Sequence, residues 1–115
     1  SGTANSGSYV PAYITLVNIS TIIPVNARYV RIGNTITVYI GVTLQATTAN
    51  ITATISISLP FNRTTSATIN IGSGSIASNS GYCQSTSTSQ LTFYYTPTDT
   101  NLKAGSISFS YDTSQ

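Results

Sequence analysis

Two stretches of the chain alternate between aliphatic and small hydroxylated residues, the pattern of a strand with one buried face. In the first, the aliphatic positions are Ile36, Val38, Ile40, Val42 and Leu44, set between Thr35, Thr37, Tyr39, Gly41 and Thr43. In the second, they are Ile51, Ala53, Ile55, Ile57 and Leu59, and the stretch ends at Pro60. We expect both aliphatic sets in the core, since burying each such side chain contributes about 1.5–3 kcal/mol.

The first stretch is also the second arm of a predicted hairpin over residues 28–44. Gly33 and Asn34 form a two-residue loop of the kind that tolerates positive φ. Arg28 and Arg31 fall on opposite faces of the first arm, so at most one of them faces the core.

Shorter alternating segments bring the expected count to about eight short strands. They cover residues 9–18, 67–71, 76–84, 90–95 and 105–111, and the last sets Ile107, Phe109 and Tyr111 inward. Between them, Gly72-Ser-Gly74 and the serine-threonine run at 85–89 are expected to be loops. No segment has a helical pattern. The spacing predicts an all-β, antiparallel sandwich of the jelly-roll kind.

The 115 residues are expected to form a single domain. Residues 1–8 are small and polar and predict a flexible lead, or a linker from an upstream segment, before a domain over residues 9–115. Residues 22–26 are expected to connect two strands, and Pro24 excludes a helix interior there.

Charged residues are scarce, at 5% of the chain with a net charge of +2. Four dispersed cations do not make a nucleic-acid surface. The polar sheet faces also lack the Lys and Glu residues that usually keep an exposed sheet soluble. Contact with another subunit explains such a face, and a plain secreted sandwich is the alternative. The interface candidates are Thr37, Tyr39, Thr43 and Arg31.

The residue types of catalysis are nearly absent. The chain has no His and no Glu, and its carboxylates are Asp99, in a turn, and Asp112, near the end. We therefore expect no enzyme, no metal and no cofactor. Cys83 is the single cysteine and is expected to be a small buried residue, since no base is present to activate it.

Eight Tyr residues among Ser, Thr, Asn and Gln point instead to binding. Tyr82 should oppose Cys83 across its strand, and one of Tyr94 and Tyr95 should face outward. The ligand-binding candidates are Asn79, Tyr82, Tyr94, Tyr95 and Arg63.

Five short motifs resemble those of one protein family. They are Gly7-Ser-Tyr-Val-Pro11, Tyr29-Val-Arg-Ile-Gly-Asn-Thr-Ile-Thr-Val38, Ile57-Ser-Leu-Pro-Phe61, Phe93-Tyr-Tyr and Ile107-Ser-Phe-Ser-Tyr111. In this order they resemble the C-terminal tip domains of tailed-phage fibres and of the phage-like trimeric fibre adhesins of predatory bacteria.

The resemblance implies a homotrimeric tip, on a virion fibre or at a cell surface and so extracellular. Such a tip binds cell-surface glycan or another envelope component. It assigns no ligand-binding residue, because the loops of such tips vary. Two alternatives stay open. One is a structural fibre or capsid module that binds only other subunits, and the other is a glycan-cleaving enzyme whose active site lies between subunits.

Overall fold

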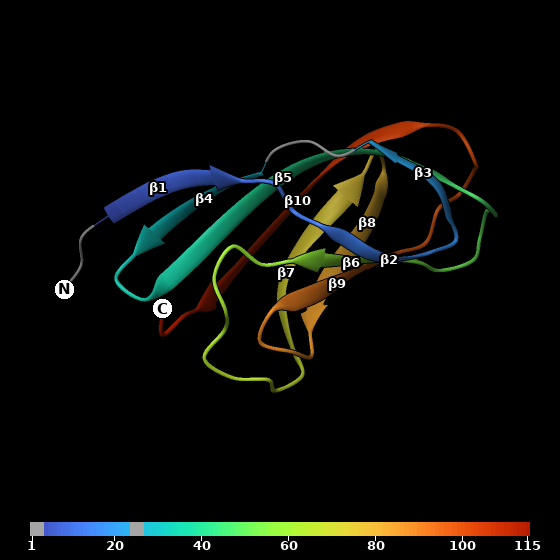
Figure 1. Ribbon diagram of the computed structural model, residues 1–115. Helices are drawn as coiled ribbons and strands as arrows, with labels where there is room; N and C mark the ends of the chain where they lie inside the picture. The colour runs from blue at the N-terminus through green and yellow to red at the C-terminus, as the bar shows by residue number, and fades with distance from the viewer. Residues whose placement is uncertain (1–3, 24–26) are drawn as a thin grey trace.

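The chain folds into ten antiparallel strands in the computed structural model, which describes residues 4–23 and 27–115 (Figure 1). The strands are β1 (Ala4–Tyr9), β2 (Tyr13–Val17), β3 (Ile19–Ile23), β4 (Ala27–Ile32), β5 (Thr35–Ala46), β6 (Ala53–Ser58), β7 (Ile69–Ile76), β8 (Asn79–Ser85), β9 (Gln90–Tyr95) and β10 (Lys103–Asp112). The prediction of an all-β antiparallel fold is confirmed.

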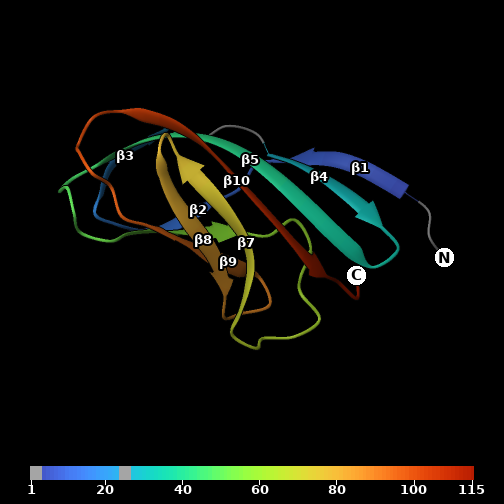
Figure 2. The same cartoon turned by 180° about the vertical axis from the view of Figure 1, so that it is seen from behind.

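All ten strands belong to one sheet, in the order β1-β4-β5-β10-β7-β8-β9-β6-β2. Strand β3 pairs with the part of β5 that is not paired with β4. The sheet curls strongly on itself, as Figures 1 and 2 show from opposite sides. We call its concave side the inner face, represented by Ile36, Ile55 and Phe93, and its other side the outer face, represented by Tyr39, Thr92 and Ser108.

The predicted sandwich is therefore wrong. A sandwich needs two sheets, but here each strand is hydrogen-bonded to the next without a break. Strands β5 and β10 explain the difference, because they pair along ten consecutive residues at the middle of the sheet. The core forms inside the curl of that one sheet.

Alternation predicted the inner face of the long strands correctly. The aliphatic residues of β5 and β6 are buried, and so are Ile107, Phe109 and Tyr111 of β10. Two residues at the ends of the second stretch are less buried than expected. Ile51 is 55% exposed because it precedes β6 in the β5–β6 loop, and Leu59 is only partly buried just beyond the strand.

Strand β7 corrects the prediction of a loop at Gly72-Ser-Gly74, since it runs through both glycines. A Cβ atom at Gly72 would lie 2.1 Å from the carbonyl oxygen of Ser108, and one at Gly74 would lie 2.5 Å from that of Ser106. The absent side chains let β10 and β7 approach closely where the sheet curls. The real turn follows β7 at Ala77, with φ of 55°.

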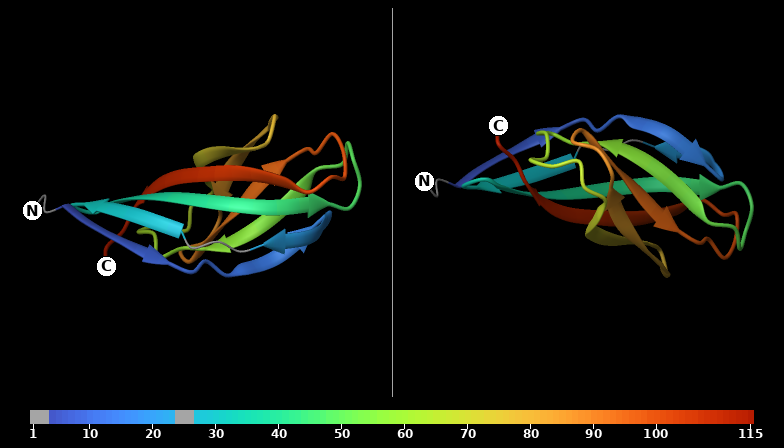
Figure 3. Two further views of the ribbon diagram at one scale, coloured as in Figure 1. Left: turned by 90° about the horizontal axis from the view of Figure 1, so that it is seen from above. Right: turned by 90° about the horizontal axis from the view of Figure 1, so that it is seen from below.

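The N-terminal strands join the two sides of the curl. Strand β2 pairs with β6, and after Asn18 the chain continues as β3 on β5. Asn18 has φ of 59°, and its side-chain amide donates hydrogen bonds of 2.8 Å to the carbonyls of Thr48 and Ile51. Figure 3 shows these strands along one side of the molecule.

Two predictions for this region change. Residues 4–8 of the expected lead belong to β1, which pairs with β4, and residues 1–3 lie outside the described residues. Residues 22 and 23 of the expected connection belong to β3. The rest of that connection, Pro24 included, also lies outside the described residues.

Candidate functional site

Tyr82 and Tyr94 form a stacked pair on the outer face. They are register partners on β8 and β9, and their ring centroids lie 4.9 Å apart with an angle of 17° between planes. Tyr82 is 46% exposed, and Tyr94 is half-buried. Stacking holds both rings in place, so that each presents a fixed apolar surface with a hydroxyl group at its rim.

The core fixes the position of this pair from the other side. Cys83 follows Tyr82 in the sequence, and Phe93 precedes Tyr94. Both side chains face inward and are fully buried. Tyr82 thus opposes Cys83, as predicted. Burial raises the pKa of the Cys83 thiol to about 12, so it is a neutral core group rather than a nucleophile.

A hollow of about 430 Å³ opens beside the stacked pair. We call it the tyrosine hollow; its lining residues are Thr52, Ser78, Asn79, Ser80, Gly81, Tyr82, Tyr94, Tyr95 and Thr96. Four of the five predicted ligand-binding residues, Asn79, Tyr82, Tyr94 and Tyr95, therefore meet at one site. Its walls offer hydroxyl and amide groups around aromatic carbon and no charged group.

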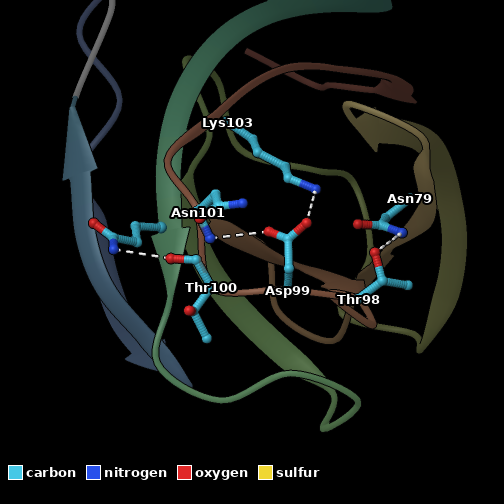
Figure 4. Close-up of polar contacts among 7 residues, drawn as sticks. Asn79, Thr98, Asp99, Thr100, Asn101 and Lys103 are labelled. Atoms are coloured by element: carbon cyan, nitrogen blue, oxygen red, sulfur yellow. Dashed lines mark hydrogen bonds and ion pairs between the residues drawn. The ribbon is translucent and has the colours of Figure 1, made fainter.

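The β9–β10 loop forms one side of this site and is held by polar contacts (Figure 4). The side-chain amide of Asn79 donates to Thr98 Oγ1 at 3.4 Å. Within the loop, Asp99 accepts hydrogen bonds from Lys103 Nζ at 2.7 Å and from the backbone N–H of Asn101 at 2.9 Å. These two donors lower the pKa of Asp99, so its carboxylate shapes the loop and carries no proton to donate.

The turn below the tyrosine hollow has an uncommon backbone conformation. Ala77, between β7 and β8, has φ of 55°, where a Cβ atom is disfavoured by about 1–2 kcal/mol. It directly precedes Ser78 and Asn79 of the lining. Backbone strain of this kind is found where the surrounding structure fixes a residue in place, often near a binding site.

Tyr95 is part of the hollow's lining, but its side chain is buried in the core. It stacks on Phe93 at 5.8 Å between centroids. Burial, and to a smaller extent the negative charge of Asp99, raises the pKa of Tyr95 to about 12. Of the adjacent pair, Tyr94 therefore faces outward and Tyr95 inward, in agreement with the predicted alternation.

Arg63 does not join the other ligand-binding candidates. It is 3% exposed, and its guanidinium donates to Ser85 Oγ at 2.7 Å, to the Ser87 carbonyl at 2.9 Å and to the Ala67 carbonyl at 2.8 Å. These bonds hold the β6–β7 connection against the β8–β9 loop. In this chain Arg63 is a structural cation.

The interface candidates divide between the two faces. Thr37, Tyr39 and Thr43 share the outer face of β5, where Thr37 is hydrogen-bonded to Ser110 at 3.0 Å. Arg31 lies on the opposite side of β4, half-buried, with its Nε donating to the Gly33 carbonyl and its guanidinium carbon 5.4 Å from the centre of the Phe61 ring. The four residues do not form one surface.

The geometry of the two carboxylates bears on catalysis. Asp99 precedes the start of β10 and Asp112 is its last residue, so the length of the strand, about 30 Å, separates them. Paired carboxylates that cleave a glycoside lie about 5–10 Å apart. These two cannot form such a pair within one chain.

The described residues lack two further kinds of functional feature, a metal-binding cluster and a membrane-spanning helix. Among residues 4–23 and 27–115, no group of three or more Cys, Asp or Glu side chains is placed to hold a metal ion. The same residues contain no helix of the length and apolar character needed to span a membrane.

Several lining residues were not among the candidates from the sequence. Ser80 lies two positions from Tyr82 and so shares its face, which is a usable signal. Thr52 and Thr96 reach the hollow only because β6 pairs with β9, a long-range pairing that alternation does not specify.

No family model, curated protein or solved structure matches this chain, so its resemblance to fibre-tip domains stays a prediction.

Proposed function

We propose that this chain is a non-enzymatic binding domain, the receptor-binding tip of a homotrimeric fibre, and that the tyrosine hollow recognises a glycan. The stacked pair of Tyr82 and Tyr94 is the observation that carries the proposal. A sugar ring has apolar C–H faces and a rim of hydroxyl groups. Aromatic surface beside uncharged donors and acceptors matches both features.

The position of the tyrosine hollow supports the role of a tip. Strand β1 begins and β10 ends at the same end of the elongated molecule (Figure 3). The β5–β6 and β9–β10 loops, which contribute Thr52 and Thr96 to the hollow, lie at the other end (Figure 3). In a fibre joined at the terminal end, the hollow would face outward.

Assembly is supported by the N-terminal edge of the sheet. Among the described residues strand β2 pairs only with β6, and Ile14, Leu16 and Val17 are exposed along it. Residues 4–23 contain no charged side chain to block pairing with another copy. We therefore place the subunit contact along this uncharged edge, which an aliphatic contact between copies would cover.

A structural module that binds only other subunits is the competing proposal. It accounts equally well for the uncharged edge, but it gives no role to the ordered tyrosine hollow. The two proposals differ in one respect: removal of a hollow-lining ring should change binding to cells in the first and nothing but stability in the second.

Screening on immobilised bacterial surface glycans and whole cells tests the binding role. We expect binding by the wild-type protein, loss of at least tenfold in affinity for Tyr82→Ala, and no change for Tyr39→Ala when the glycan is neutral. No binding by folded wild-type protein, or full binding by Tyr82→Ala, would contradict the proposal.

Light scattering tests the assembly separately. We expect a trimer for the wild-type protein and a monomer for Leu16→Arg, since a buried unpaired cation opposes association. A wild-type protein that is monomeric at micromolar concentration would contradict the trimer but leave the tyrosine hollow untouched.

A further inference from the structure

Arg28 differs from every other charged residue of the chain in having no partner among the described residues. The other charged residues all have partners. Lys103 and Asp99 pair at 2.7 Å, and Asp112 accepts a hydrogen bond from Thr35. Arg63 is buried in its three hydrogen bonds, and Arg31 contacts the Gly33 carbonyl and the Phe61 ring. Arg28 is exposed on the outer face of β4. Its five guanidinium N–H groups are available to a ligand.

Register places an aromatic ring and hydroxyl groups beside this guanidinium. Arg28 is the partner of Tyr39 on β5, which is in turn the partner of Ser108 on β10, and on the other side Arg28 is the partner of Ser8 on β1. Tyr39 is 50% exposed. A cation, an aromatic surface and serine hydroxyls therefore lie in one row across four strands.

Two shallow hollows meet at Arg28 and Tyr39. One, of about 350 Å³, lies over β5 and β10 and is bordered by Gly41 and Ser106; the other, of about 340 Å³, lies over β1 and β4 and includes Ser6. A Cβ atom at Gly41 would meet nothing within 4 Å, so the floor of the first hollow is open. A ligand held by Arg28 has room on either side.

We propose that Arg28 and Tyr39 form a second binding site, for a sugar that carries one carboxylate. A guanidinium fork binds a carboxylate through two parallel charge-assisted hydrogen bonds, and a single cation matches a single negative charge. The ring of Tyr39 packs on the sugar, and the neighbouring serines bind its hydroxyl groups. Both carboxylates of the chain are committed elsewhere, so neither competes for Arg28.

This site is separate from the tyrosine hollow and does not depend on it. Strands β10 and β7 lie between β5 and β8, so three strand spacings, about 14 Å in all, separate Tyr39 from Tyr82. The two sites also differ in charge, because the tyrosine hollow contains no cation.

Chemical-shift titration of the intact domain with simple probes tests the second site. The probes are methyl glucuronide, methyl glucoside, acetate and inorganic phosphate. We expect methyl glucuronide to bind at least tenfold more tightly than the other three, with the shifts centred on Arg28, Tyr39 and Ser108. Added salt should weaken this binding, since part of it is a charge interaction.

Matched variants separate this site from the tyrosine hollow. Arg28→Gln and Tyr39→Ala should each reduce glucuronide affinity about tenfold, Arg28→Lys should reduce it less, and Tyr82→Ala should leave it unchanged. Unchanged affinity in folded Arg28→Gln, equal binding of glucoside and glucuronide, or tighter binding of phosphate would overturn the second site. Loss in Tyr82→Ala alone would move the acidic sugar to the tyrosine hollow and overturn the second site while leaving the proposed function intact.

Discussion

The inner and outer faces of the sheet are built from the same strands but differ in residue type and in packing. On β5, and on β10 from Ile107 to Tyr111, every second residue is a buried aliphatic or aromatic side chain, and each residue between is Thr, Ser, Gly or Tyr, apart from the end of β5. The inner face has no spare room, as Gly72 shows. The outer face has room at Gly41 and hollows beside its tyrosines. Stability is therefore concentrated on the inner face, and both of the proposed binding sites lie on the outer face.

Ionisation of the inner face should have the largest effect. Burial raises the pKa of Cys83, Tyr95 and Tyr111 to about 12, from ordinary values of 9 to 10. A raised pKa means that the folded state favours the protonated form. The resulting stability is complete below about pH 9 and is lost as the pH rises towards 12. We predict unfolding between pH 10 and 12, measured by circular dichroism.

The acid side should behave differently. The chain has two carboxylates, and the lowered pKa of Asp99 gives stability that is lost as the pH falls below its ordinary value of 3.8. Asp99 is near the surface, so this loss should be small. A midpoint at pH 4 with stability retained at pH 12 would contradict this account of the core.

Adding a single methyl group to each face should give the next largest contrast. Gly72→Ala forces a Cβ atom against the Ser108 carbonyl and should cost more than about 4 kcal/mol, or prevent folding. Gly41→Ala, on the outer face of β5, should change the free energy of unfolding by less than about 0.5 kcal/mol. Urea unfolding of both variants measures the difference, and equal costs would show that the faces are packed alike.

Replacing a buried and an exposed arginine in turn should give a smaller difference in stability. Arg63→Met removes the donor to the Ala67 carbonyl and one of the two donors to the Ser87 carbonyl, and it should cost about 2–4 kcal/mol. Arg28→Met removes an exposed guanidinium and should cost less than about 0.5 kcal/mol. The midpoints of thermal unfolding compare them, and a stable Arg63→Met protein would mean that its hydrogen bonds contribute little.

The smallest effect should come from a polar contact of the outer face. Thr37 and Ser110 share an exposed hydrogen bond of 3.0 Å across β5 and β10. Water replaces such a bond, so Thr37→Ala should change the free energy of unfolding by less than about 0.5 kcal/mol. If Thr37→Ala instead abolished trimer formation in light scattering, the subunit contact would belong on this face and not along β2.

The sequence carried the local pattern but not the long-range pairing. Alternation located the inner residues of β5, β6 and β10 and the outward position of Tyr82, because side-chain direction has a period of two. It could not distinguish a sandwich from one curled sheet, since that depends on how β10 pairs with β5 and β7. The prediction of a loop at the glycines of β7 was also wrong, because these glycines allow close contact with β10.

The candidate site was predictable in part for the same reason. Asn79, Tyr82, Tyr94 and Tyr95 lie on adjacent strands that are close in sequence, so composition alone pointed to one region. Arg63 looked equally available in the sequence. Its burial follows from the positions of Ser85, Ser87 and Ala67 around it, which only the folded chain reveals.

We propose that the outer face of the sheet binds ligand and that the inner face stabilises the fold. Chemical-shift mapping of the labelled domain, with a glycan selected by the screen on immobilised surface glycans, tests this proposal most directly. We predict the largest shifts at Tyr82, Tyr94 and Asn79, with little change at Cys83 and Phe93 behind them. Shifts confined to the edge strand β2, or centred on the inner face, would contradict this proposal.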